Sequence, residues 1–119
     1  MANPNIVNVS TINGITDIQE LNTTYTTGLV ANSASSGKVY KINSIVCTNK
    51  GSSDTTVRIS YYDGSNDRFV AYNTSVPQGT VLIVTDKNSS FYLTEGHSIR
   101  GGAAANSVID CVISYEDIS

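Results

Sequence analysis

The chain has 119 residues, only 14% of them charged, and carries a formal net charge of −3 with a single histidine. Its seven basic residues are scattered singly, so the sequence lacks the clustered Lys and Arg side chains that nucleic-acid binding requires. No apolar run approaches the ~20 residues of a membrane-spanning helix, and no secretion signal is visible at the start. We therefore expect one domain, made without secretion, that binds neither nucleic acid nor membrane.

An apolar N-terminal segment precedes the first secure strand. Its apolar residues, which we expect to contact another subunit, are Ile6, Val7, Val9 and Ile12. The turn signal Asn13-Gly14 follows. Between Ile15 and Leu21 apolar residues recur at every third position, which fits a helical turn as well as an irregular excursion. Residues 1–12 are therefore predicted to form an arm that docks on a partner subunit.

The middle of the chain reads as strands. A Thr-rich strand is predicted over Asn22–Val30, and a loop follows it. The long strand Lys38–Asn49 carries apolar residues at both parities, so we expect it to be covered on both sides or to meet a neighbouring subunit on one. Thr55–Tyr62 alternates cleanly and predicts a half-buried strand. The Asp-Gly turn over Asp63–Asn66 predicts a hairpin with the strand Arg68–Asn73.

The last third is the most strongly patterned. Short strands are predicted over Thr80–Thr85, Ser90–Leu93, Ser98–Arg100 and Val108–Tyr115, with a small-residue loop over Gly101–Asn106. The breaks between them are too short for parallel crossovers, so the strands must be mostly antiparallel. The final run is predicted to be core, with Val112 and Ile113 both buried. Eight or nine short strands in total predict an all-β fold, an antiparallel β-sandwich or jelly roll.

Catalytic chemistry finds little support in the sequence. His97 is the only side chain whose ordinary pKa suits general-base catalysis near neutrality. The sequence has no G-x-S-x-G nucleophile elbow, and the adjacent Ser98 would point to the opposite face of a strand. We therefore expect His97 to be an exposed turn residue, and the chain not to be an enzyme.

No metal or cofactor is expected. Cys47 and Cys111 lie in apolar strands and are predicted to be buried thiols, although a disulfide stays open because it depends on an unknown Cα separation. A metal site would need more ligands than these two and His97. The carboxylates of Asp54, Asp63 and Asp67 lack the calcium-loop spacing and are expected to serve turns.

The chain resembles the short virion structural proteins of tailed phages, most closely those of phages that infect marine cyanobacteria. The resemblance spans the whole chain and is carried by MANPNIVNVSTINGIT, by SSGKVYKINSIVCTN and by the stretch from Val76 to Ser119. Its most specific part is YLTEGHSIR, followed by a small-residue loop and VISYEDIS. The resemblance implies a particle component and assigns no catalytic residue.

Three functions are compatible with these observations. The first is a capsid decoration (cement) protein that binds the outer shell, with the major capsid protein or other virion proteins as partners. The second is a neck, tail or fibre-attachment module, and the third is a small carbohydrate-binding lectin. The resemblance places the protein in the virion, assembled in the cytoplasm of the host bacterium. We expect a homo-oligomer, and a trimer by analogy with viral modules on threefold positions.

Overall fold

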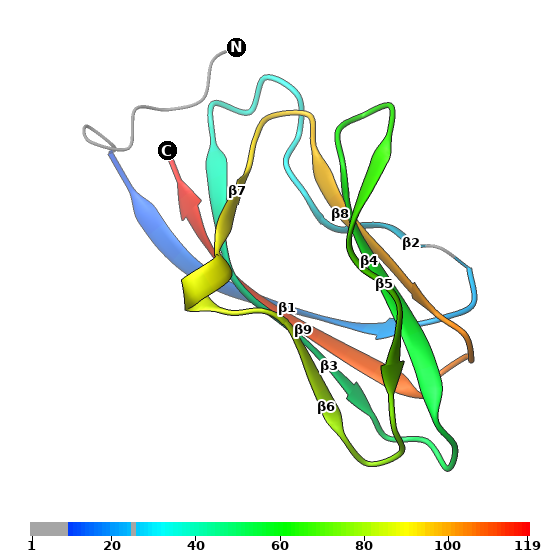
Figure 1. The fold of residues 1–119 in the computed structure, drawn as a ribbon. Coiled ribbons are helices and arrows are strands. Elements are labelled where there is room, and N and C mark those ends of the chain that lie inside the picture. Colours follow the sequence, from blue (N-terminus) through cyan, green and yellow to red (C-terminus); the bar gives the residue numbers. More distant parts are fainter. Residues whose placement is uncertain (1–9, 25) are drawn as a thin grey trace.

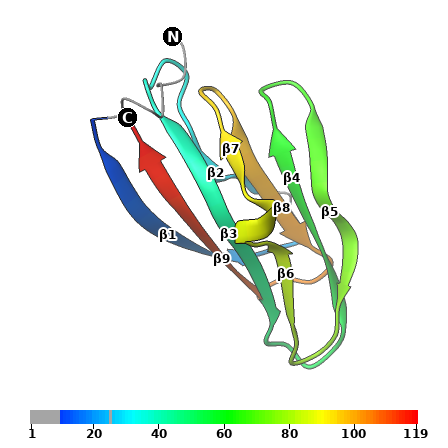
Figure 2. The ribbon, with the colours of Figure 1, turned by 60° about the vertical axis from the view of Figure 1, so that its left-hand side comes forward.

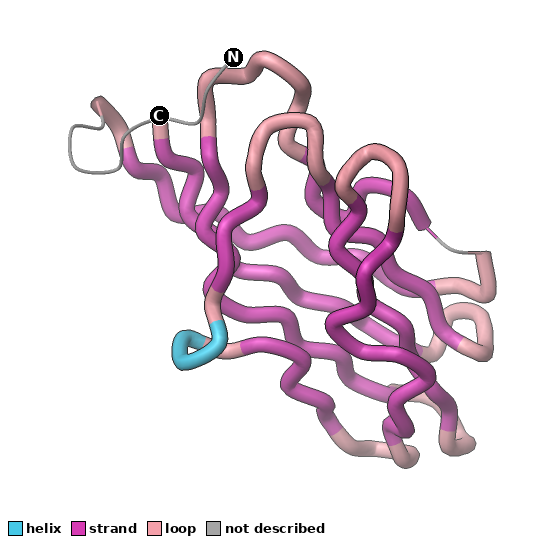
Figure 3. The backbone as a smooth tube through the Cα atoms, turned by 45° about the horizontal axis from the view of Figure 1, so that its top comes forward, coloured by secondary structure: helices cyan, strands magenta, loops and turns pink. Residues whose placement is uncertain are grey.

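A computed structural model of the chain describes residues 10–24 and 26–119. The described part holds nine strands and one short 3-10 turn (η1), so the expected all-β fold is confirmed (Figure 1; η1 is cyan in Figure 3). The elements are β1 (Ile12–Leu21), β2 (Thr26–Ala31), β3 (Val39–Asn49), β4 (Thr55–Tyr62), β5 (Asp67–Val76), β6 (Val81–Thr85), η1 (Lys87–Ser89), β7 (Phe91–Leu93), β8 (Ser98–Ala103) and β9 (Ile109–Ile118).

The strands form two antiparallel sheets packed face to face. Sheet A has the order β1-β9-β3-β6, with β7 also paired to β3, and sheet B has the order β2-β8-β4-β5. Figure 2 shows β1, β9 and β3 side by side in one layer, with β4 and β5 in the other. The pairs are nested along the chain: β4 with β5, β3 with β6 and β7, β2 with β8, and β1 with β9. One long hairpin, folded over into two layers in this way, is a jelly roll.

The predicted turn at Asn13-Gly14 and the helical alternative for Ile15–Leu21 are both wrong. β1 runs without interruption opposite β9, from the pair Ile12↔Ile118 to the pair Leu21↔Ile109. On a strand, residues three apart fall on opposite faces. The apolar repeat therefore supplies both faces of β1: Leu21 is buried, whereas Ile18 is 77% exposed. Pairing with β9 along the whole strand overrides the local turn signal.

β8 is longer than predicted. The loop expected to begin at Gly101 begins only after Ala103, because Gly101 and Gly102 pair with β4. A Cβ at Gly101 would lie 2.8 Å from Leu29 Cδ1 and 2.9 Å from Ile59 Cδ1. Glycine is therefore needed here for close packing within a strand, and not for a turn.

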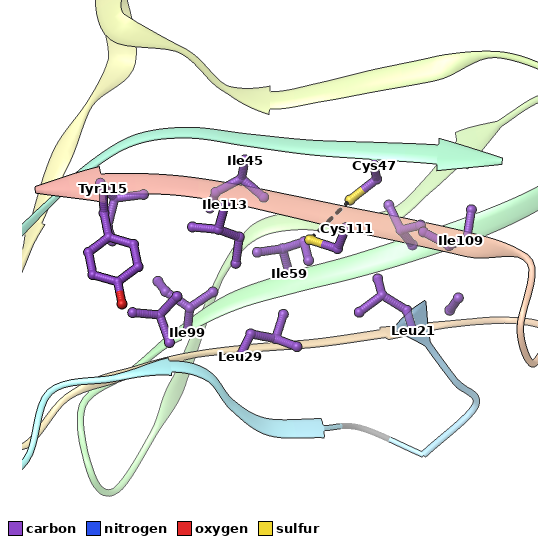
Figure 4. Packing of buried hydrophobic residues seen from close by; sticks show 14 of the residues in the cluster. Leu21, Leu29, Ile45, Cys47, Ile59, Ile99, Ile109, Cys111, Ile113 and Tyr115 are labelled. Atoms are coloured by element: carbon purple, nitrogen blue, oxygen red, sulfur yellow. Dashed lines mark hydrogen bonds between the residues drawn. The ribbon is translucent and has the colours of Figure 1, made fainter. Parts of the chain in front are cut away.

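The core lies between the two sheets, and its centre is shown in Figure 4. Val57 and Ile59 of β4 are fully buried, which confirms the predicted alternation. Ser60, which falls on the opposite face of β4, is also buried, and its hydroxyl donates to Asp67 Oδ1 at 2.8 Å. At one end of the sandwich the buried Asn49 holds the loops together, since its Nδ2 donates to Val76 O at 2.9 Å.

Candidate interaction surfaces

His97 is a structural residue and not the exposed turn histidine that the sequence suggests. Its ring is half-buried, and Nδ1 lies 2.6 Å from both Tyr61 Oη and Thr94 Oγ1. The edge of one ring also packs on the other, with the centroids of His97 and Tyr61 5.3 Å apart. The hint of this contact in the sequence is that Tyr61 falls on the same side of β4 as Val57 and Ile59, which face the core. These contacts fasten the β7–β8 turn to sheet B.

The carboxylates considered as calcium ligands all have partners within the chain. Asp63 Oδ1 accepts two backbone N–H groups of its own turn, at 2.9 and 2.7 Å, and these bonds lower the pKa of the carboxyl. Asp54 accepts the backbone N–H of Gln78 at 2.8 Å, and Asp67 faces Arg100 at 3.0 Å. Among the described residues, no group of three potential metal ligands is found.

An exposed row of apolar side chains crosses the outer face of sheet A. Ile18 on β1 lies opposite Val112 on β9, Val112 lies opposite Val46 on β3, and Val46 lies opposite Ile83 on β6. Residues directly opposite one another point to the same face of a sheet. We call these four residues the apolar rung. Ile18 is 77%, Ile83 59% and Val112 39% exposed, and Val46 is half-buried.

The apolar rung corrects one prediction and qualifies another. Val112 was expected in the core but faces outward, whereas its neighbour Ile113 is 1% exposed and belongs to the core. The two apolar parities of β3 are also explained, because Ile45 and Cys47 face sheet B while Val46 joins the outer row. A neighbouring subunit over that outer face remains a prediction.

Where the rung crosses β1 and β9, polar residues border it on both sides, whereas on β6 the exposed Val81 continues the apolar surface. On one side Glu20 and Asp110 face each other and share Lys50, whose Nζ lies 2.6 Å from Glu20 Oε2 and 3.0 Å from Asp110 Oδ1. The bond to Lys50 lowers the pKa of Glu20. On the other side lie the hydroxyl groups of Thr16 and Ser114. An apolar centre with a polar rim is the usual composition of a protein-binding surface.

A shallow hollow of about 390 Å³ adjoins the rung between β1 and β9. Its lining includes Ile18 and Val112 of the rung, Glu20 and Asp110 of the charged border, and Cys111. The surface of sheet A is therefore concave at this end, and a side chain of a partner protein can fit into the hollow.

A second surface lies at the edge of the sandwich where β5 of sheet B and β6, η1 and β7 of sheet A meet solvent. A groove of about 500 Å³ is lined there by aromatic rings and one cation, namely Tyr61, Phe69, Phe91, Tyr92 and Arg68. Phe91 packs against Tyr61 with centroids 5.9 Å apart, so the floor of the groove is fixed by the core. Tyr72, 61% exposed, contacts Phe69 outside it.

Of the predicted subunit-contact residues, the structure places only Ile12, since Ile6, Val7 and Val9 lie outside the described residues. Ile12 is the first residue of β1 and its side chain is 55% exposed. The chain is attached to β9 even before Ile12, because the backbone N–H groups of Ser10 and Thr11 both donate to Ser119 O, at 2.7 and 3.0 Å. Ile12 therefore belongs to the sheet, and its contact with another subunit remains a prediction, as does the docking arm over residues 1–12.

The sequence did not reveal the apolar rung as a unit. Its four residues come from four separate strands, and only the register between these strands aligns them. The single available signal was the apolar character of both faces of β3.

No family model matches the chain, and neither does any curated protein or solved structure. The resemblance to phage virion proteins therefore remains a prediction. Within the described part of the chain, no helix is both long and apolar enough to cross a membrane.

Proposed function

We propose that this chain is a structural protein of a tailed-phage virion, most specifically a capsid decoration protein that binds the outer shell through the outer face of sheet A. The observation that carries the proposal is the apolar rung, which spans four strands and is exposed on a chain otherwise rich in Ser, Thr and Asn. A contiguous apolar row with a polar rim marks a protein contact. Jelly rolls recur in viral capsid proteins, which supports this setting by analogy of fold.

The size of the rung favours binding by several copies together. Full burial of a Val or Ile side chain is worth about 1.5–3 kcal/mol, and the rung residues are already partly covered, so one copy gains about 5 kcal/mol from them. Association costs about 4–15 kcal/mol, so a single copy binds weakly. A homo-oligomer, for example a trimer, engages several repeats of the shell at once and multiplies the affinity. The partner is the major capsid protein or another repeated virion protein.

The proposal is tested by adding purified protein to particles that lack it and measuring co-sedimentation. The double variant Ile18→Asp/Ile83→Asp places two charges on the rung at exposed positions, so it should fold normally and lose at least tenfold in particle binding. Tyr72→Asp, at an exposed position in sheet B outside both the rung and the aromatic groove, is the control and should bind as the wild type does. Equal binding of all three proteins would show that sheet A is not the contact face.

Cryo-electron microscopy of the decorated particles then separates the two virion functions. Density on the outer shell supports decoration, and symmetry at threefold positions supports the trimer. Density confined to the neck or tail would replace the proposal with an attachment module, and the virion setting would stand.

A lectin-like module is the second candidate, and the aromatic groove is the observation in its favour. Aromatic rings with one exposed cation at Arg68 can stack on a sugar ring and bind an acidic group. Binding of the purified protein to a glycan array, abolished by Tyr92→Ala and not by Ile18→Asp, would support this function over decoration.

A further inference from the structure

Two buried thiols face each other at the centre of sheet A. Cys47 on β3 lies directly opposite Cys111 on β9, and the two Sγ atoms are 3.9 Å apart (Figure 4). The side chains are 0% and 1% exposed, and both cysteines are free. The sequence left the question of a disulfide open because the distance between the two Cα atoms was unknown. The register now shows that the two cysteines are direct neighbours on paired strands.

The geometry suits a disulfide. Residues directly opposite in antiparallel strands have Cα atoms about 4.5–5.5 Å apart, within the ~4.4–6.8 Å that disulfides span. Bonded sulfurs lie about 2.05 Å apart, so the two Sγ atoms must approach by about 2 Å. Rotation of the two side chains toward each other can supply this movement while the backbone register stays in place.

We propose that Cys47 and Cys111 form a latent disulfide site, reduced while the chain folds and closed when the folded protein meets a small oxidant such as a peroxide. The occasion for closure rests on the proposed function: a virion protein is made in a reducing cytoplasm and is released by lysis into oxidising surroundings. The disulfide site itself depends only on the geometry of β3 and β9.

The oxidation takes place in two steps. The thiolate of Cys47 attacks one oxygen of hydrogen peroxide, the O–O bond breaks, and a sulfenic acid and hydroxide form; the hydroxide takes up the proton lost by the thiol. Cys111 then attacks the sulfenic sulfur, the S–S bond forms, and water leaves. Two thiols are oxidised by two electrons and one peroxide is reduced to two water molecules.

Two features of the site govern this chemistry. Hydrogen bonding to Cys111 lowers the pKa of Cys47, while the same interaction and burial raise the pKa of Cys111, so the first thiolate is favoured at Cys47. Burial also decides which oxidants can react. The Cys111 side chain faces the core and is 1% exposed, so only an oxidant small enough to enter the packed interior reaches the thiols, and a bulky disulfide such as oxidised glutathione does not.

Closure would lock the proposed docking face. The pair Cys47↔Cys111 is next to the pair Val46↔Val112, which forms the middle of the apolar rung. A covalent bond between β3 and β9 fixes the register that aligns the rung. It also joins residues 64 apart in the chain, so it restricts the unfolded state strongly.

The test uses purified folded protein treated with hydrogen peroxide or, separately, with oxidised glutathione. With peroxide we expect the intact mass to fall by two hydrogen atoms, the thiol titre in denaturant to fall from two to zero, and a Cys47–Cys111 cross-linked peptide to appear after digestion. The melting temperature should rise by about 10 °C and return on reduction. Oxidised glutathione should react far more slowly.

Cys47→Ala and Cys111→Ser serve as controls, each measured against its own untreated form, and neither should gain melting temperature with peroxide. Sulfinic acids in place of the cross-link, cross-linking between chains only, or a lowered melting temperature after closure would each overturn the proposal. Because the assay uses no particles, its failure would leave the decoration proposal intact, and failure of particle binding would leave the disulfide site intact.

Discussion

Gly101 shows at the scale of one residue how tightly the two strands of sheet B around it are packed. Its position within β8 leaves no room for a Cβ, which would contact Leu29 and Ile59 at under 3 Å. Gly14 on β1 has the opposite surroundings, since a Cβ there would meet nothing within 4 Å. Glycine is thus required by close packing at position 101 but not at position 14, and the same substitution to alanine at both positions tests this difference.

We expect Gly101→Ala to lower the free energy of unfolding by about 1–3 kcal/mol, because the added methyl overpacks the core. Gly14→Ala should leave stability unchanged or raise it by up to about 1 kcal/mol, because alanine loses less backbone entropy on folding. Urea denaturation measures both. Adding Ile59→Val, which removes the contacting Cδ1 atom, should recover part of the loss in Gly101→Ala. Equal effects of the two glycine substitutions would show that the close contact at β8 relaxes at no cost.

At the scale of the element, β9 carries the core on one face and the proposed docking surface on the other. Ile113 is buried against sheet B, whereas Val112 is exposed in the apolar rung. The same substitution at these adjacent positions therefore tests two different properties.

Ile113→Asp should unfold the domain, because an unpaired carboxylate buried in the core costs several kcal/mol. Val112→Asp should keep a melting temperature within a few degrees of the wild type and lose particle binding. Circular dichroism and co-sedimentation distinguish the two variants. A Val112→Asp protein that is unfolded would place Val112 in the core, as the sequence alone suggested.

The elements of this fold could be predicted where a local pattern decides them. The alternation over Thr55–Tyr62 and the Asp63-Gly64 turn gave β4 and its hairpin correctly. The sequence misassigned β1 because its pairing with β9 overrides a turn signal that is strong in isolation. The apolar rung and the cysteine pair could not be predicted, since both depend on the register between strands that are distant in sequence.

At the scale of the whole molecule, two tyrosines contribute to the loss of stability at high pH. Burial is the main cause that raises the pKa of Tyr115 and of Tyr40, and the bond from Tyr115 Oη to Asp17 Oδ2 at 3.1 Å adds to it for Tyr115. A raised pKa in the folded state means that the folded protein binds the phenol proton more tightly than the unfolded chain does. The stability gained in this way is complete below the ordinary tyrosine pKa of about 10 and is lost as pH rises above it.

The free energy of unfolding should therefore fall between about pH 9.5 and pH 11, and Tyr115→Phe should make that fall shallower while lowering the value at neutral pH. Lys38, whose pKa is raised by its bond to Asp117, and Lys50, whose pKa is raised by its bonds to Glu20 and Asp110, act in the same direction, so part of the fall should remain. Tyr72→Phe, at an exposed ring, is the control. Urea midpoints measured across this range test the assignment, and an unchanged slope in Tyr115→Phe would contradict it.

The nested order of strand pairs also has a consequence for synthesis on the ribosome. The innermost pair, β4 with β5, can form as soon as its hairpin has emerged, because it is local in sequence. β1 and β3 both pair with β9, which follows all the other strands of the sandwich in the sequence, so the middle of sheet A cannot assemble until β9 has left the exit tunnel. Until β9 has been made, β1 and the edge of β3 that pairs with β9 stay unpaired, which makes the nascent chain a natural client for chaperones.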